Sequence, residues 1–219
     1  MPRSPRLPHW LACALLGLFA GGAQAGTTPP APDALQPLLA TMNERLHISE
    51  LVALTKWDSG KPVQDNAREA QVIANARAQA IQRKLDPDDV ADLIAAQIEA
   101  SKLVQYGRIA QWQAAHKAPD TPRPDLGNDI RPKLDTLQNL LLTQYAAFLP
   151  YRKDPNCPQW LATERSALIK DYLHGQAMIR ATGELCVVCC VLWGDDSEVI
   201  QTKSPAQSAG LFHGISLSM

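Results

Sequence analysis

Two cations on one predicted helix are the first sign of chemistry in this chain of 219 residues. Arg45 and Lys56 lie 11 residues apart in an amphipathic stretch. Each helical residue turns the chain by about 100°, so this separation returns to within roughly 20° of the starting direction. Both side chains therefore leave the same side of one helix, where they could bind a dianion. The alternative is that each cation snorkels from the edge of an apolar stripe towards water.

Further polar residues follow at spacings that suggest a single site. The segment Asp65-Asn66-Ala67-Arg68-Glu69 begins nine residues after Lys56, and Ser101 and Gln105 stand at i and i+4 in a later helical stretch. Taken alone, each of these groups is more simply explained as a structural polar residue of a helical bundle. Their joint spacing is the observation that favours a functional site.

Apolar residues recur at helical spacing through most of the chain and predict an all-α fold. No segment before residue 186 shows the sustained alternation of a strand. We expect a single-domain bundle of about six helices. Their approximate ranges are 33–56, 63–84, 86–117, 128–150, 157–175 and 176–185.

Capping residues, glycines and prolines set the expected ends of these helices. Asp33 and Asp86 are the predicted N-caps of the first and third helices, and Pro87 suits a first helical position. The segment 118–124 holds three prolines, which a helix cannot cross, and so connects the third helix to the fourth. Gly175 is expected to end the fifth helix.

The N-terminus has the order of features of a secretory signal. Arg3 and Arg6 precede the apolar run 10–20, and Ala23-Gln24-Ala25 provides the small-x-small pattern of a signal-peptidase site. A buried N-terminal helix would not need this order. We expect residues 1–25 to be removed. The mature protein should be soluble in a periplasm or outside the cell, since no later segment is apolar enough to span a membrane.

Charge and motifs argue against several classes of function. The net charge of −1 is unlike that of a general nucleic-acid binder. The sequence lacks the motifs of dinucleotide-binding folds, phosphate loops, zinc proteases and serine hydrolases. Its five histidines contain no i, i+4 pair. We therefore expect no nucleic-acid partner and no metal ion.

Taken together, the polar residues resemble the active site of the all-helical chorismate mutases. In that family an Arg, a Lys, an acidic residue, an Arg-Glu pair and a Ser or Thr followed at i+4 by Gln or Glu build one pocket at the spacing found here. The resemblance implies a chorismate mutase type II-like fold and the conversion of chorismate to prephenate. The matching residues are Arg45, Lys56, Asp65, Arg68, Glu69, Ser101 and Gln105.

The signal segment and the length make the chain similar to the secreted, or gamma, branch of that family. This branch takes a second carboxylate-binding Arg from a later segment of the same chain, and Arg131 stands at that place. The branch also has a disulfide that ties its last helices together, and Cys157 and Cys186 correspond to its two cysteines. The resemblance therefore implies both a complete pocket in one chain and this disulfide.

The similarity extends over about residues 33–186 and implies a catalytic domain at 26–186. The remaining residues, 187–219, form an extension without a counterpart in the family pattern. Cys189 and Cys190 lie in it and have no match. A poorly ordered or aberrant tail is a simpler interpretation of this extension than a new module.

The resemblance implies a role for each residue of the site. Arg45 and Arg131 would bind the two carboxylates of chorismate, with Ser101 as a hydroxyl donor. Lys56 and the amide of Gln105 would donate to the ether oxygen, where negative charge develops in the transition state. The rearrangement is pericyclic, so the resemblance implies no nucleophile and no cofactor.

Glu69, with Asp65 near it, would accept a hydrogen bond from the substrate hydroxyl, and Arg68 would orient Glu69. A second hypothesis keeps the same cations without catalysis, in a secreted helical protein that binds an anion or a protein partner. Gln105 favours the enzyme, because a simple anion binder has no need for a neutral donor aimed at an ether oxygen. A homodimer is one assembly that the resemblance allows.

Overall fold

The computed structural model describes residues 28–187, and every regular element in that range is helical. The predicted all-α fold is confirmed. The signal segment 1–25 and the cysteines Cys189 and Cys190 of the extension lie outside the described residues. The α-helices are α1 (Leu35–Ser59), α2 (Asn66–Gln82), α3 (Pro87–Ala115), α4 (Arg131–Phe148), α5 (Cys157–Ser166) and α6 (Tyr172–Thr182).

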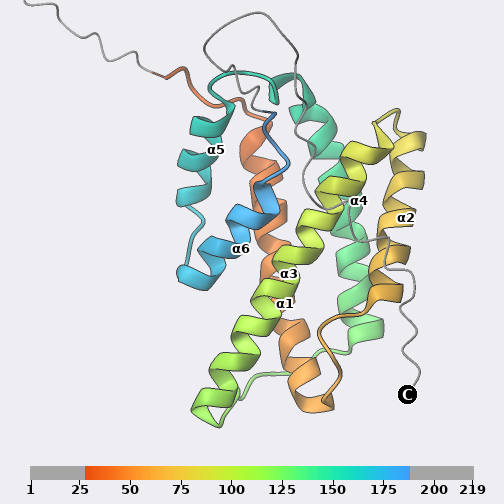
Figure 1. The fold of residues 1–219 in the computed structure, drawn as a ribbon, viewed down its shortest axis with the longest axis vertical. Coiled ribbons are helices and arrows are strands. Elements are labelled where there is room, and N and C mark those ends of the chain that lie inside the picture. The colour runs from red at the N-terminus through yellow and green to blue at the C-terminus, as the bar shows by residue number, and fades with distance from the viewer. Residues whose placement is uncertain (1–27, 188–219) are drawn as a thin grey trace, which may run out of the picture. The chain divides into compact units, whose positions relative to one another are not determined.

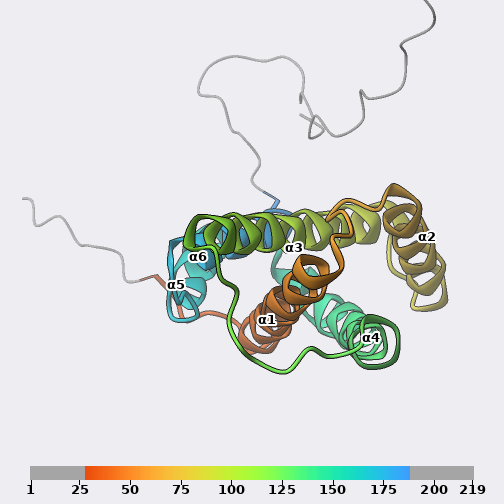
Figure 2. The same cartoon turned by 90° about the horizontal axis from the view of Figure 1, so that it is seen from below.

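Helix α1 is the central element of the bundle. It packs against α3, α4, α5 and α6, and α3 also packs against α2 and α6. Figures 1 and 2 show α1 and α4 on the same side of α3, with α2 at the end of the bundle away from α5. Within residues 28–187, no helix combines the length and apolarity that a membrane span requires.

The apolar stripe of α1 explains its central place. In its first two turns Leu35, Leu38, Leu39 and Met42 are fully buried, in a core cluster that also contains Leu93 and Ile94 from α3 and Phe148 from α4. Burying one such side chain contributes on the order of 2 kcal/mol. The stripe holds α1 against its neighbours and leaves the adjacent side of the helix for polar residues.

The N-terminal end of α1 differs from the prediction. Asp33 is not its N-cap, because the helix begins at Leu35 after Ala34, which makes no side-chain capping bond. The backbone N–H of Leu35 instead donates to the carbonyl of Pro32 at 2.9 Å. At the other end the helix runs to Ser59 and stops at Gly60, whose φ of 66° is left-handed.

Helix α3 begins as predicted, whereas α2 begins later. Asp86 accepts hydrogen bonds from the backbone N–H groups of Asp88 and Asp89 at 2.8 and 3.1 Å, with Pro87 in the first turn. Helix α2 starts only at Asn66, because the preceding residue takes the N-cap position. The segment 60–65 is therefore a loop between α1 and α2.

The boundary between α5 and α6 was predicted wrongly. Helix α6 already begins at Tyr172, so Gly175 lies inside α6 and does not end α5. Asp171 caps α6 by accepting from the backbone N–H of His174 at 2.8 Å. A Cβ atom at position 175 would approach Ile169 at 3.3 Å. The glycine therefore permits a close contact within the bundle and is not a helix terminator.

The connector before α4 has the expected proline-rich form. No helix is present at 118–124, and a single π-helical turn, Leu126–Ile130, leads into α4. Asp125 caps this turn by accepting from the backbone N–H of Asn128. Pro132 lies in the first turn of α4, where its missing N–H costs no helical hydrogen bond.

A disulfide joins Cys157 at the start of α5 to Cys186, which follows α6. Nearby, the Arg152 guanidinium donates to the carbonyls of Glu184 and Leu185 and to Asp89 at the start of α3. These bonds fix the end of the described chain against the first turn of α3.

We expect the double change Cys157→Ala and Cys186→Ala to lower the free energy of unfolding by about 3 to 4 kcal/mol. The reason is that the disulfide closes a loop of 29 residues and removes that freedom from the unfolded chain. Urea denaturation of the two proteins measures the effect. An unchanged midpoint would show that this disulfide does not contribute to stability.

Candidate active site

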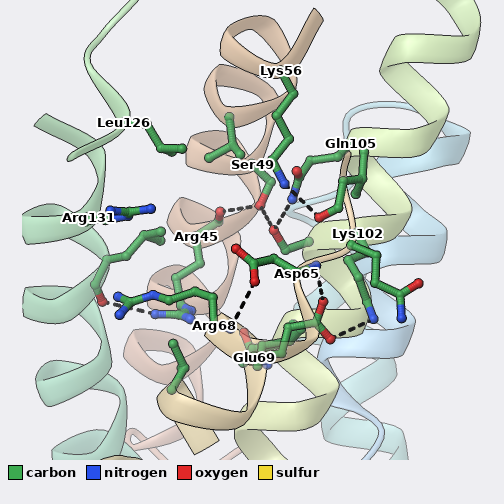
Figure 3. Close-up of a pocket in the computed structure, with 18 of the residues that line it drawn as sticks. Arg45, Ser49, Lys56, Asp65, Arg68, Glu69, Lys102, Gln105, Leu126 and Arg131 are labelled. Atoms are coloured by element: carbon green, nitrogen blue, oxygen red, sulfur yellow. Dashed lines mark hydrogen bonds and ion pairs between the residues drawn. The ribbon is translucent and has the colours of Figure 1, made fainter. Parts of the chain in front are cut away.

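A cavity of about 470 Å³ lies among α1, α2, α3 and the start of α4. Every residue that the sequence placed in the site lines this cavity, although the residues come from four helices and a loop. Figure 3 shows most of them pointing into one region between the helices. The residues are Arg45, Lys56, Asp65, Arg68, Glu69, Ser101, Gln105 and Arg131.

Arg45 is the cation that α1 presents near the middle of the bundle. One of its terminal nitrogens donates to the backbone carbonyl of Leu134 on α4 at 3.2 Å. Its Nε atom is buried and has no hydrogen-bond partner among the described residues. Burial lowers the pKa of the guanidinium to about 10, and Asp135 partly offsets this effect. The group therefore stays charged at neutral pH and keeps a donor free.

Lys56 connects the same face of α1 to the loop that follows it. Its Nζ atom donates to the backbone carbonyl of Val63 at 2.7 Å. Burial lowers the pKa of Lys56, whereas the nearby carboxylates of Asp65 and Glu69 raise it. An ammonium group has three N–H donors, so the bond to the loop leaves others for a ligand.

The start of α2 orients two of the site carboxylates. Asp65 is the N-cap and accepts from the backbone N–H of Arg68 at 3.0 Å, while Glu69 accepts from the backbone N–H of Asp65 at 3.2 Å. This reciprocal pair resembles a capping box, with Asp at the cap and the returning carboxylate one position later than usual. The cap fixes the direction in which α2 enters the site. It also gives Asp65 a structural role that the spacing of residues in the sequence did not predict.

A chain of hydrogen bonds crosses from α3 to α1. The Nε2 atom of Gln105 lies 3.0 Å from Oγ of Ser101, which lies 2.8 Å from Oγ of Ser49. Gln105 is only 5% exposed, and its Oε1 atom has no partner in the part of the chain that the structure describes. Buried amides normally satisfy both ends, whereas here the unpaired end is the carbonyl oxygen, which can only accept a hydrogen bond.

Two residues of this cavity, Ser49 and Lys102, were missed from the sequence. Ser49 stands four residues after Arg45 and seven before Lys56, so the helical period that paired those cations could have found it. Lys102 directly follows Ser101 and stands at i+3 from Glu99, a common helical ion-pair spacing. Neither signal distinguishes a site residue from an ordinary polar one.

Lys102 bridges α3 to the carboxylate of α2. Its Nζ atom lies 3.0 Å from Glu69 and 2.7 Å from Glu99. Burial on its own would lower the pKa of Lys102, but the hydrogen bonds and charges of Glu99 and Glu69 outweigh it and raise the pKa. The side chains of Lys102 and Glu69 are only 14% and 21% exposed, so solvent screens this pair less than it screens a surface pair.

Positive charge dominates the cavity. Among the described residues that line it, six carry a cationic side chain and three carry a carboxylate. The described residues contain no cluster of three or more His, Cys, Asp or Glu side chains arranged to hold a metal ion. The arrangement therefore suits a small ligand with more than one negative charge, held by nitrogen donors from several directions.

Comparisons with known proteins agree with this geometry. A family model described as chorismate mutase type II matches residues 36–106. A secreted chorismate mutase of Mycolicibacterium smegmatis is 33% identical over 147 residues, which cover 67% of this chain and 81% of the relative. A secreted chorismate mutase of Yersinia pestis is 31% identical over 131 residues, which cover 60% and 64% of the two chains.

Solved structures give the same result. The chorismate mutase of Burkholderia phymatum superposes with a TM-score of 0.69 and 39% identity, over 71% of this chain and 98% of that one. The chorismate mutase of Burkholderia thailandensis superposes with a TM-score of 0.67 and 32% identity, over 71% of this chain and 100% of that one. The fold and cavity define an all-helical protein with a cation-rich internal site. The chain belongs to the chorismate mutase type II family.

We expect Arg45→Met to raise the free energy of unfolding by roughly 1 kcal/mol, because methionine fills the space without a desolvated charge. The matched change Arg131→Met affects an exposed residue of the same cavity and should alter stability by less than about 0.5 kcal/mol. Urea denaturation compares the variants. A clear loss of stability in Arg45→Met would contradict the inference that burying this charge costs stability.

Proposed function

We propose that this chain is a chorismate mutase that converts chorismate to prephenate by a Claisen-type rearrangement. The observation that carries the proposal is the cation-rich cavity, which is lined by residues as far apart in the sequence as Arg45 and Arg131. Chorismate is a dianion, and its rearrangement has no covalent intermediate. The protein therefore needs to position the substrate and stabilise developing charge, without a nucleophile.

Substrate binding rests on Arg45 and Arg131. Each guanidinium would bind one carboxylate, and Ser101 would add a hydroxyl donor. Two fixed carboxylates hold the enolpyruvyl arm over the ring, so the reacting carbons approach before the reaction begins. The bond of Arg45 to the backbone of Leu134 supports this role, because it fixes the guanidinium in the cavity and uses only one of its five N–H donors.

Transition-state stabilisation rests on Lys56 and Gln105. As the carbon–oxygen bond breaks, negative charge grows on the ether oxygen, and both side chains would donate to that atom. Their positions support the assignment, since one extends from α1 and the other from α3 into the same cavity. Lys56 supplies charge, and Gln105 supplies a donor that does not depend on pH.

Glu69 would accept a hydrogen bond from the substrate hydroxyl. Its two oxygens already receive bonds from the backbone of Asp65 and from Lys102, and a carboxylate has further lone pairs. Arg68 lies one position before Glu69 on α2 and adds positive potential to the cavity. Lys102 therefore keeps Glu69 in place and offsets the charge that would otherwise repel a dianion.

Export of the protein is part of the proposal. The N-terminal segment 1–25 has the features of a signal peptide, and relatives of this chain are named secreted chorismate mutases. The periplasm or the exterior would then be its location. Since Arg131 of the same chain lines the cavity, each chain of a homodimer would have its own complete site.

The alternative function, binding of an anion or a partner without catalysis, is less well supported. An anion site gains little from an amide such as Gln105, which is buried with one end unsatisfied. The direct test is to incubate the purified protein with chorismate, without any added cofactor, and to follow prephenate formation. A protein that binds chorismate but forms no prephenate would establish the alternative.

We expect Lys56→Ala to lower kcat by about 100- to 1000-fold, because it removes a preorganised charge that acts mainly on the transition state. Steady-state kinetics with chorismate measures the loss. The matched control is Lys61→Ala, which removes a more exposed cation from the same cavity and should retain most of kcat. A near-native rate for Lys56→Ala would contradict the site assignment.

We expect Gln105→Glu to introduce a pH dependence that the native protein lacks between about pH 5 and pH 8. A glutamic acid donates a hydrogen bond only while protonated, and burial raises the pKa of a carboxyl group. The variant should be active at the acidic end and lose kcat/KM as the pH rises through that pKa. Paired pH–rate profiles measure this effect. Identical profiles would show that Gln105 does not contact the ether oxygen.

A further inference from the structure

We propose that Ser49 is a positioning residue that orients Ser101 and Gln105 for the reaction. Ser49 lies on α1, lines the cavity and is only 2% exposed. Its Oγ atom lies 2.8 Å from Oγ of Ser101 and 2.9 Å from the backbone oxygen of Arg45. Figure 3 shows both bonds, the first between α1 and α3 and the second within α1. This inference rests on the proposed function, since it concerns the same site.

The number of hydroxyl protons limits how these bonds are shared. A serine hydroxyl has one proton, and the carbonyl of Arg45 can only accept. When Ser49 donates to that carbonyl, Ser101 must be the donor in the hydrogen bond between the two hydroxyls. The Ser101 oxygen then has only lone pairs to offer to Nε2 of Gln105, at 3.0 Å. The donors therefore all point one way, from the amide on α3 to the backbone of α1.

This direction decides which end of the Gln105 amide faces Ser101. With Ser101 as an acceptor, the amide turns its nitrogen to the hydroxyl and keeps a second N–H for another acceptor. Without Ser49, the Ser101 proton could be donated to Oε1 of Gln105, and the amide could turn over. Ser49 therefore selects one of two amide orientations before substrate arrives, which is the preorganisation that the reaction needs.

Substrate binding allows a second arrangement of the same bonds. When a carboxylate reaches Ser101, the Ser101 proton can turn to it, and the Ser49 proton can turn to the Ser101 oxygen. The carbonyl of Arg45 is still satisfied, because in an α-helix it accepts from the backbone N–H four residues on. Ser49 thus remains a partner of Ser101 in the empty and the occupied site.

The simpler explanation is that Ser49 only satisfies itself by bonding to its own helix, as serines in helices often do. Ser59 provides the comparison, since its Oγ atom bonds to the carbonyl of Thr55, also four residues earlier on α1, at 2.7 Å. Ser59 is exposed and does not line the cavity. Ser59→Ala is therefore the matched control for Ser49→Ala.

Kinetics with chorismate tests the proposal in the full chain. Losing one hydrogen bond of this kind should lower kcat/KM of Ser49→Ala by about 2- to 10-fold. Ser49→Thr, which keeps the hydroxyl, should retain most of the activity, and Ser59→Ala all of it. In a Ser101→Ala background, Ser49→Ala should cause no further loss. An equal loss in both backgrounds, or a native rate for Ser49→Ala, would overturn the proposal.

A second measurement does not depend on activity. The side-chain amide signals of Gln105 in a ¹⁵N-labelled protein are identified by their absence in Gln105→Ala. We expect Ser49→Ala to shift these signals and Ser59→Ala to leave them unchanged. Unchanged signals in Ser49→Ala would overturn the proposal. If native protein failed to form prephenate, the proposed function would fail, while these signals would still report whether Ser49 orients the amide.

Discussion

The structure depends on one helix that must carry a buried apolar stripe and two cations directly beside it. Helix α1 places Leu38, Met42 and Leu46 in the core, and places Arg45 and Lys56 in the cavity. The cations gain no stability from their surroundings, since burial lowers the pKa of both. The apolar stripe must therefore hold α1 in place against the cost of burying these two charges.

The carboxylates of the cavity neutralise part of its positive charge, but the net charge of the lining stays positive. Asp65 and Glu69 are fixed by the cap of α2, and Glu69 is also held by Lys102 from α3. The result is a set of carboxylates that already have partners facing cations that still have free donors. A dianionic substrate would neutralise the remaining positive charge of the cavity. The relief of repulsion among the cations would then contribute to substrate binding.

The sequence predicted the features that depend on a single helix. The period of α1 placed Arg45 and Lys56 together, and Asp86 with Pro87 located the start of α3, because caps and helical phase are local properties. Ser49 and Lys102 were missed because their importance comes from partners 52 and 33 residues away. Gly175 was misread for a different reason, since its neighbour Ile169 is near in sequence but lies across a turn whose shape only the packed bundle defines.

Lys56 also positions the loop between α1 and α2. Its ammonium group holds the carbonyl of Val63, and the segment 61–65 that contains Val63 forms part of the cavity lining. The residue proposed to donate to the ether oxygen therefore also holds a loop that lines the cavity. Since Asp65 ends this loop and caps α2, the position of Lys56 is linked to the direction of α2 and to Glu69. Any change that frees the loop should therefore disturb the donor and the acceptor of the site together, because one short segment positions both.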